Sequence, residues 1–224
     1  MDLNEAVFTR RSIRRYQPVP VEFEKVGRVI LSANEAPTAG NIQDFRIIIV
    51  QNDATRKKLA EASLQQYWME QAPVHLVICS DIKRGKQFYG SRGERLYAVQ
   101  HTGAAAMLML LEAHAQGLGA CWVGAFDEEM VKATCGIPDY ARPHAIITLG
   151  YADEVVPKPP RFIIETFTYI ERYNNKIRNF PIAITEWSPV VMETVKGAVH
   201  EVNKAGTGAV DWIRDQIKSF GKKK

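Results

Sequence analysis

The sequence predicts one domain of mixed helices and strands, followed by a C-terminal extension. The chain has 224 residues, which is long enough for one substantial α/β-type domain with room for an appendage. Amphipathic helical patterns alternate with short apolar runs as far as residue 160. From Phe162 onward the chain is aromatic and polar, and core-like runs are sparse. We therefore expect the extension to wrap the domain or a neighbouring chain.

The first part of the domain contains two predicted helices joined by extended backbone. Apolar residues recur on one face of residues 2–10, which predicts a short amphipathic helix. Pro18 and Pro20 then force extended backbone. Apolar periodicity predicts a second helix over residues 21–36, which Pro37 ends.

Two strands and a helix are predicted next. Residues 45–50 form a run rich in β-branched side chains, which indicates a buried strand. Residues 53–71 show a helical pattern, and residues 74–79 form a second apolar run that predicts a strand.

The longest helical pattern covers residues 95–116 and is apolar on nearly all sides. A helix of this kind is buried, either centrally or against a partner subunit. Gly117 provides a left-handed C-cap, and a third strand follows at residues 120–123. Residues 128–135 predict a short helix, and residues 144–151 predict a fourth strand.

Composition and charge favour a soluble globular protein. Hydrophobic residues make up 46% of the chain, charged residues 24%, and the formal net charge is +4. No window approaches ~18 uninterrupted apolar residues, and the N-terminus has no signal-peptide pattern. We expect a cytoplasmic protein without a membrane span. In the extension, residues 192–220 predict one or two amphipathic helices, and we expect these to pack across a dimer rather than on a membrane.

A local basic cluster near the N-terminus suits a discrete anion. Four of the 29 basic residues lie between Arg10 and Arg15, and no carboxylate accompanies them. Guanidinium groups bind phosphate oxygens bidentately, and the hydroxyl of Ser12 can add a short hydrogen bond. Spacing alone leaves a phosphate site and a solvated basic surface equally open. A nucleic-acid surface is not expected, because no aromatic interleaving or second basic stripe is present.

Other patterns that could carry chemistry are missing from the sequence. A dinucleotide fingerprint starting at Gly117 would need glycine at position 122, where Trp122 stands. The three cysteines lack C-x-x-C spacing, and the five histidines lack metal-ligand spacing. No G-x-S-x-G nucleophile pattern is present. A protein with an anion site but without a nucleophile, base or metal can take its chemistry from a cofactor.

Four segments resemble motifs of the nitroreductase-like flavoproteins. Arg10–Arg14 is similar to the R-R-S-x-R opening, and Ala36–Gln43 resembles the start of A-P-S-A-G-N-x-Q-P-W. Gly117–Gly124 resembles G-L-G-T-C-W-I-G, and Gly150–Arg161 is similar to the closing G-Y-P…K-P-R stretch. Because the four follow one another at the right spacing, residues 1–165 are identified as the nitroreductase-like FMN-binding domain. Residues 166–224 are then the largely helical extension.

The resemblance implies an α+β fold, in which a mostly antiparallel central sheet is flanked by helices as an α-β-α sandwich. It also implies an intertwined homodimer with FMN at the subunit interface. The implied activity is that of an FMN-dependent oxidoreductase. NADH or NADPH would reduce the flavin by hydride transfer to N5. A small acceptor such as a nitroaromatic, a quinone or a flavin would then take two electrons in a ping-pong cycle, with no catalytic protein residue and no metal.

The resemblance also assigns the residues that hold FMN. Arg10, Ser12 and Arg14 would bind the phosphate, the ribityl chain and the N1/O2 edge, and Arg161 would join them at the phosphate. A positive group near N1 stabilises the anion formed on reduction. The full set of expected cofactor-binding residues is Arg10, Arg11, Ser12, Arg14, Pro37, Thr38, Asn41, Val123, Gly124, Ala125 and Arg161.

Two parts of this set approach the flavin ring. Thr38 and Asn41 would reach it from the other subunit, and backbone N–H groups around Gly124 and Ala125 would face N5 and O4. The long helix over residues 95–116 would then lie in the dimer core, which accounts for its all-round apolarity.

The chain departs from the family pattern beside the flavin. Asp44 and Phe45 replace Pro-Trp, and His101 and Leu108 stand where Asp and Asn are common. Thr38 replaces serine but keeps the hydroxyl. These departures leave the substrate open.

Two alternatives to the general oxidoreductase also remain. One is a specialised relative: a reductive dehalogenase, a flavin-fragmenting enzyme or a deazaflavin-linked enzyme. The other is a non-catalytic flavin-binding interaction protein. The enzymes would differ in the lid over the flavin, for which residues 65–71 and 88–95 are the candidate segments.

Overall fold

Four strands form one antiparallel sheet in the order β1-β2-β4-β3. In the computed structural model, which describes residues 1–176, the strands are β1 (Phe45–Val50), β2 (Val74–Asp81), β3 (Gly119–Val123) and β4 (Ala141–Gly150). Strands β2 and β4 occupy the centre, and nearly all of their residues are buried. The antiparallel pairing confirms the predicted sheet.

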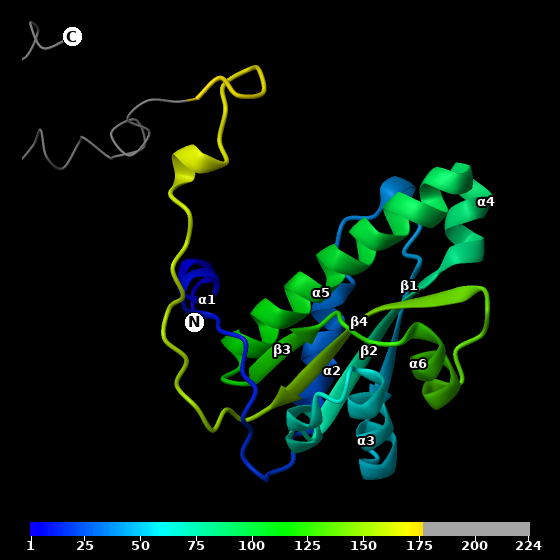
Figure 1. The fold of residues 1–224 in the computed structure, drawn as a ribbon, viewed down its shortest axis with the longest axis vertical. Coiled ribbons are helices and arrows are strands. Elements are labelled where there is room, and N and C mark those ends of the chain that lie inside the picture. Colours follow the sequence, from blue (N-terminus) through cyan, green and yellow to red (C-terminus); the bar gives the residue numbers. More distant parts are fainter. Residues whose placement is uncertain (177–224) are drawn as a thin grey trace, which may run out of the picture. The chain divides into compact units, whose positions relative to one another are not determined.

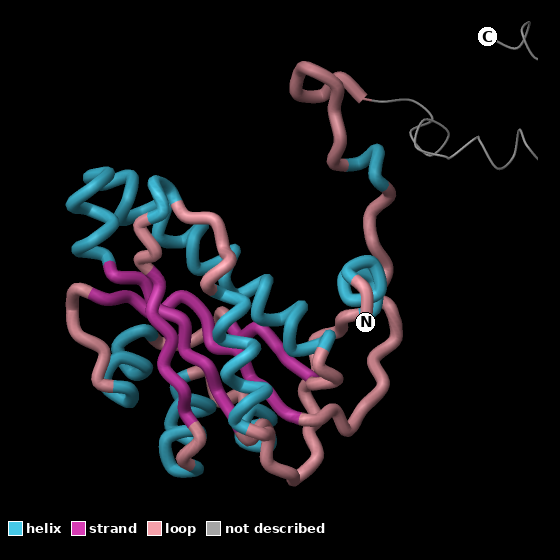
Figure 2. Tube along the Cα trace, turned by 180° about the vertical axis from the view of Figure 1, so that it is seen from behind, coloured by secondary structure: helices cyan, strands magenta, loops and turns pink. Residues whose placement is uncertain are grey.

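Six α-helices surround this sheet: α1 (Leu3–Thr9), α2 (Phe23–Ala33), α3 (Asp53–Ala62), α4 (Ile82–Arg92), α5 (Ala98–Ala115) and α6 (Glu128–Cys135). Figures 1 and 2 show α2 and α5 on one face of the sheet and α3 and α6 on the other. Short helical turns occur at Ala39–Asn41 and Tyr67–Gln71, and a π-helical turn occurs at Gly93–Tyr97. Within residues 1–176, no helix combines the length and apolar character that a bilayer span requires.

Successive side chains of β2 enter two different cores, because strand side chains alternate between the faces of a sheet. Leu76 and Ile78 pack with residues of α2 and α5. Val77 and Cys79 pack with residues of α3 and α6. A strand covered on both faces reads as a continuous apolar run. This two-sided burial confirms the predicted α-β-α sandwich.

The chain divides into two compact units, Met1–Pro159 and Pro160–Lys224. The first unit contains the sheet and all six α-helices. In the second, the described residues form a helical turn at Ile164–Thr166 and a bridge between Tyr169 and Lys176. The predicted helices at residues 192–220 lie outside the described residues. The proposed boundary at residue 165 therefore stays a prediction.

The single helix predicted over residues 53–71 is wrong. Helix α3 ends at Ala62, whose carbonyl accepts the backbone N–H of Asp127 at 2.8 Å. Leu64 and Gln65 then adopt left-handed backbone with φ of 56° and 59°, and a separate turn follows at Tyr67–Gln71. A tertiary contact ends the helix here. The sequence therefore contains no glycine or proline that would mark the break.

Helix α4 has no counterpart among the predicted elements, and α5 begins at Ala98 rather than residue 95. Glycine has low helix propensity, and three glycines between Gly85 and Gly93 conceal the helical pattern. Two of them allow a close backbone approach, since a Cβ on Gly93 would lie 2.1 Å from the carbonyl oxygen of Gly85. The predicted left-handed glycine after α5 is confirmed: α5 is followed by the C-cap residue Gln116 and then by Gly117, which has a φ of +75°.

The segment that follows α1 is attached to the sheet. The N–H of Ile13 donates to the carbonyl of Ala120 in β3 at 3.0 Å. The buried hydroxyl of Tyr16 lies 2.6 Å from the carbonyl oxygen of Ile13 and 2.7 Å from the Oγ1 of Thr148 in β4. Burial raises the pKa of Tyr16, so the phenol stays neutral. This hydroxyl therefore fixes the segment over the third and fourth strands.

We expect His75 to make the protein sensitive to acid. Its ring is fully buried in β2, and Nε2–H donates to the carbonyl of Met69 at 2.9 Å. Burial lowers the pKa of His75 from 6.5 to about 4, so near pH 5 the unfolded chain binds a proton that the folded chain does not. The contribution of the neutral, buried His75 to the free energy of unfolding is complete above pH 6.5 and declines toward pH 4. It should fall by about 2 kcal/mol between pH 7.5 and 5.

The matched variant is His75→Gln, whose amide can still donate but cannot titrate. The free energy of unfolding, measured with urea at both pH values, should fall less in the variant than in the wild type. An equal fall in the two proteins would contradict this role, because other histidines titrate in both.

We also expect Tyr16→Phe to destabilise the fold by about 1–3 kcal/mol, because it removes the hydroxyl partner of the buried Ile13 carbonyl and leaves the Thr148 hydroxyl with only a 3.5 Å contact to the Cys121 carbonyl. Adding Thr148→Val removes one of these groups and should restore part of the loss. Urea unfolding of the single and double variants measures this, and additive losses would argue against the pairing.

Candidate functional site

The predicted anion ligands lie on one face of an extended segment. Side chains of extended backbone alternate in direction, so Arg10, Ser12 and Arg14 face away from the side of Ile13. Ile13 is buried against Gly119, where an added Cβ would lie 3.0 Å from the Ile13 side chain. Ser12 forms an isolated β-bridge with Ala120, so the segment runs alongside the edge strand β3. The structure thus brings these three ligands together beside β3.

Arg11 and Arg15 bind groups of the protein. The guanidinium of Arg11 donates to the carbonyls of Phe8 and Arg10 at 3.0 and 2.8 Å. Arg15 forms an ion pair with Asp153 at 3.5 Å. A role for Arg11 in cofactor binding stays a prediction.

A carboxylate from beyond β4 holds the backbone of the arginine segment. The Oε1 of Glu154 accepts the N–H groups of Arg14 and Arg15 at 2.5 and 3.0 Å. The guanidinium of Arg14 lies over the ring of Trp68, 5.8 Å from its centroid. Sequence reasoning missed Glu154, because 140 residues separate it from Arg14 and no local pattern marks it.

The end of β3 lies beside this segment. Val123 is buried, whereas Gly124 and Ala125 are exposed. The side chain of Gln66 donates to the carbonyl of Ala125 at 3.4 Å, so the first candidate lid segment begins here. We call the following set the arginine half-site: Arg10, Ser12, Arg14, Val123, Gly124 and Ala125.

The remaining predicted ring contacts lie in a loop after α2. Pro37 and Asn41 are exposed and Thr38 is half-buried. The Oγ1 of Thr38 accepts the N–H of Gln43 at 3.2 Å, and the side-chain oxygen of Asn41 accepts from the Gln43 amide at 3.0 Å. We call Pro37, Thr38 and Asn41 the loop half-site.

The two half-sites lie at opposite ends of α5 (Figure 1). The hydroxyl of Thr9, beside the arginine segment, is 2.7 Å from the Nε2 of His114 near the end of the helix. The N–H of Ala39, in the loop, donates to the Nε2 of His101 near its start. Thirteen helical residues separate the two histidines, which is a rise of about 20 Å. The two segments are therefore attached at opposite ends of α5. Arg161 is exposed and belongs to the second unit.

The side chains near these half-sites include no activated nucleophile. Burial raises the pKa of Cys121 despite the nearby arginines, and it raises the pKa of Cys79 to about 12, so both thiols stay protonated at neutral pH. Each of the four histidines within residues 1–176 has a hydrogen-bonding partner, and no group of potential metal ligands occurs in that range.

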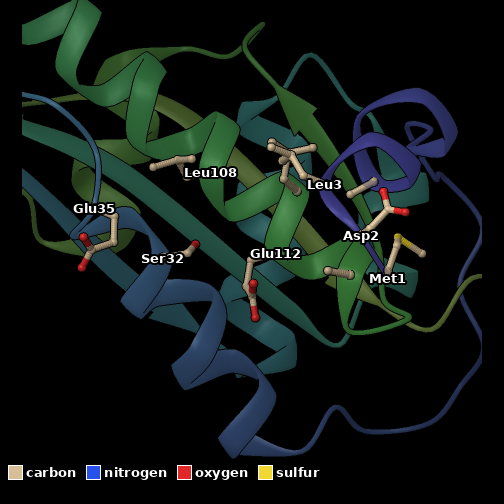
Figure 3. A pocket seen from close by; sticks show the side chains of 10 residues that line it. Met1, Asp2, Leu3, Ser32, Glu35, Leu108 and Glu112 are labelled. Atoms are coloured by element: carbon tan, nitrogen blue, oxygen red, sulfur yellow. The ribbon is translucent and has the colours of Figure 1, made fainter.

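A hollow of about 300 Å³ lies between α1, α2 and α5 (Figure 3). Its walls include Leu3, Leu108 and Leu111, together with the carboxylates of Glu35 and Glu112. None of the predicted cofactor-binding residues lines it. We therefore place the candidate site at the half-sites and not in this hollow.

Known proteins resemble this chain in sequence. The sequence matches the Nitroreductase family over residues 7–68 and 63–151. It is 34% identical over 183 residues to a Thermus thermophilus protein named NADH dehydrogenase. The aligned region covers 69% of this chain and 88% of that protein. The sequence is 28% identical over 180 residues to the FMN reductase [NAD(P)H] of Bacillus subtilis, covering 74% of this chain and 72% of that one.

A solved structure has the same fold. B. megaterium NfrA2 superposes with a TM-score of 0.71 at 25% identity, covering 88% of this chain and 84% of the other. The predicted α+β fold is confirmed by this likeness and by the antiparallel sheet. The family predicted from four short motifs is confirmed as well: this chain belongs to the nitroreductase family.

Proposed function

We propose that this chain is an FMN-dependent NAD(P)H oxidoreductase that acts as a homodimer. The arginine half-site carries the proposal, because extended backbone along β3 directs two arginines and a serine to one face, and the strand ends in the exposed residues Gly124 and Ala125. Cations and hydroxyl donors are what a phosphate monoester requires. The match to a relative named FMN reductase [NAD(P)H] supports the same cofactor and the same electron donors.

The side chains of the arginine half-site would bind and orient the cofactor. Arg10 and Ser12 would hold the phosphate, and Arg14 would place its charge at the N1/O2 edge, where negative charge develops on reduction. Stacking on Trp68 and the hydrogen bond to Glu154 limit the motion of Arg14. Bound FMN would supply hydride acceptance from NAD(P)H and two-electron transfer, in a ping-pong cycle, to an acceptor such as a nitroaromatic, a quinone or a flavin.

A second subunit would complete the site. The loop half-site belongs to a segment attached near the start of α5, whereas the segment that leads into the arginines is attached near the end of that helix. Apolar side chains are exposed on α1 and α5, among them Leu3 at 72%, Phe8 at 64% and Val99 at 46%. Exposed apolar groups of this kind favour an interface. A twofold dimer would thus pair each arginine half-site with the partner's loop half-site.

We expect the purified yellow protein to bleach when it is mixed with NADH or NADPH under anaerobic conditions. Hydride transfer removes the long-wavelength absorbance of oxidised flavin, and a stopped-flow spectrum with each donor measures the preference. Admitting a nitroaromatic or a quinone should restore the colour. Colour that persists with both donors would favour a non-catalytic flavin-binding protein or a specialised relative. A protein that takes up no FMN would exclude the proposal.

We expect two defective chains to complement each other. One chain carries Arg10→Glu and Arg14→Glu, and the other carries Thr38→Ala and Asn41→Ala, so neither homodimer has an intact site. Each heterodimer has one intact site and one doubly defective site. Statistical mixing should therefore restore FMN binding of wild-type affinity at about one quarter of all sites. Different affinity tags verify that heterodimers form, and no recovery in verified heterodimers would place both half-sites in one chain.

A further inference from the structure

A buried carboxylate–imidazole pair lies directly beneath the loop half-site. Asp44 is fully buried and His101 is 4% exposed. The Nδ1 of His101 lies 2.6 Å from the Oδ1 of Asp44. On the other side of the ring, the Nε2 of His101 is 2.8 Å from the backbone nitrogen of Ala39. The imidazole therefore connects a carboxylate to the backbone between Thr38 and Asn41.

The partners determine which ring nitrogen carries the proton. A backbone N–H can only donate, so the Nε2 of His101 must accept from Ala39. The proton of a neutral imidazole is then on Nδ1, which donates to Asp44. A protonated Nε2 would face another donor and lose the bond to the loop. The hydrogen bond to Asp44 thus selects the tautomer that binds Ala39.

The loop depends on contacts of this kind. Asn41 and Gln43 have positive φ angles of 55° and 47°, a left-handed backbone that is strained for residues other than glycine. It persists only where the surroundings hold it. Ala39 lies within the same short stretch, so its bond to His101 attaches the strained loop to α5.

Aromatic rings hold the imidazole and the loop from the side of α4. Tyr97 stacks on His101 with ring centroids 6.2 Å apart, and Tyr89 packs edge-on against Tyr97 at 5.3 Å. The Tyr89 hydroxyl lies so close to Gly40 that a Cβ there would be 2.2 Å from it. The ring of His101 is therefore fixed in orientation as well as in tautomer.

The second carboxylate oxygen of Asp44 is buried without a hydrogen-bonding partner. An unpaired buried carboxylate oxygen lowers stability, so stability alone does not explain an acid at this position. We infer that Asp44 and His101 are positioning residues for the flavin: Asp44 keeps the His101 Nε2 an acceptor, and His101 holds the loop so that Thr38 and Asn41 meet the cofactor. This inference rests on the proposed FMN site.

The test uses the full chain with His101→Phe, which keeps an aromatic ring but offers Ala39 no acceptor. The N–H of Ala39 should exchange faster with D₂O in the cofactor-free protein. FMN should bind about ten-fold more weakly, as expected for the loss of contacts to a misplaced loop. Asp44→Asn replaces an acceptor-only carboxylate by an amide that can also donate to Nδ1, so the tautomer is no longer selected, and both measurements should shift in the same direction. The double variant should bind FMN no more weakly than His101→Phe alone, because Asp44 acts through His101.

Two further variants separate positioning from general stability. His144→Phe removes another histidine hydrogen bond, to Ser80 at 2.7 Å, and should lower the Tm without changing Ala39 exchange or FMN affinity. His101→Gln, which has no ring tautomer, can offer a carbonyl oxygen to Ala39. It should retain more affinity than His101→Phe, and adding Asp44→Asn to it should change little.

The outcomes also distinguish this inference from the proposed function. Faster Ala39 exchange with unchanged FMN affinity would overturn the positioning role while the FMN site stands. Additive losses in the double variant would overturn the route through His101. A wild-type chain that binds no FMN would overturn the proposed function itself, and this inference with it.

Discussion

The burial of β2 and β4 on both faces is the constraint on which the rest of the structure depends. Leu76 and Ile78 enter one core and Val77 and Cys79 the other, so the middle of the sheet has no surface for a ligand. Polar groups that bind a cofactor must lie at the edge of the sheet or in loops beyond its ends. The arginine segment occupies the edge along β3, and the loop half-site occupies the opposite end of α5.

The elements with uninterrupted local patterns could be predicted from the sequence. The six residues of β1 were identified to the residue, and the two helical turns of α6 likewise, because β-branched runs and acidic helix starts are local signals. The break after α3 could not be predicted, since it depends on the bond from Asp127 to Ala62. Helix α4 was missed for the opposite reason: its glycines oppose a helix locally. Packing of Gly85 against Gly93 overrides the first of them, whereas Gly90 has non-helical backbone and kinks the helix.

The same distinction applies to the candidate site. The motif around Ser12 assigned Arg10 and Arg14 to the cofactor, and that assignment stays a prediction; extended backbone after α1 directs alternate side chains to one face. Glu154 and the pairing of Asp44 with His101 involve sequence separations of 140 and 57 residues, which no local pattern encodes. Asp44 and His101 were each noted as departures from the family pattern. In the folded chain these two departures are the two ends of one hydrogen bond.

The length of α5 between His101 and His114 also limits how such a protein can change. One inserted residue would rotate every following side chain by about 100° and move Met109 and Ala113 out of the core. It would also shift the attachment at Thr9 relative to the attachment at Ala39. Insertions and deletions are tolerated best in exposed connections. Length differences among relatives should therefore accumulate in those connections, while this stretch of helix keeps its number of residues.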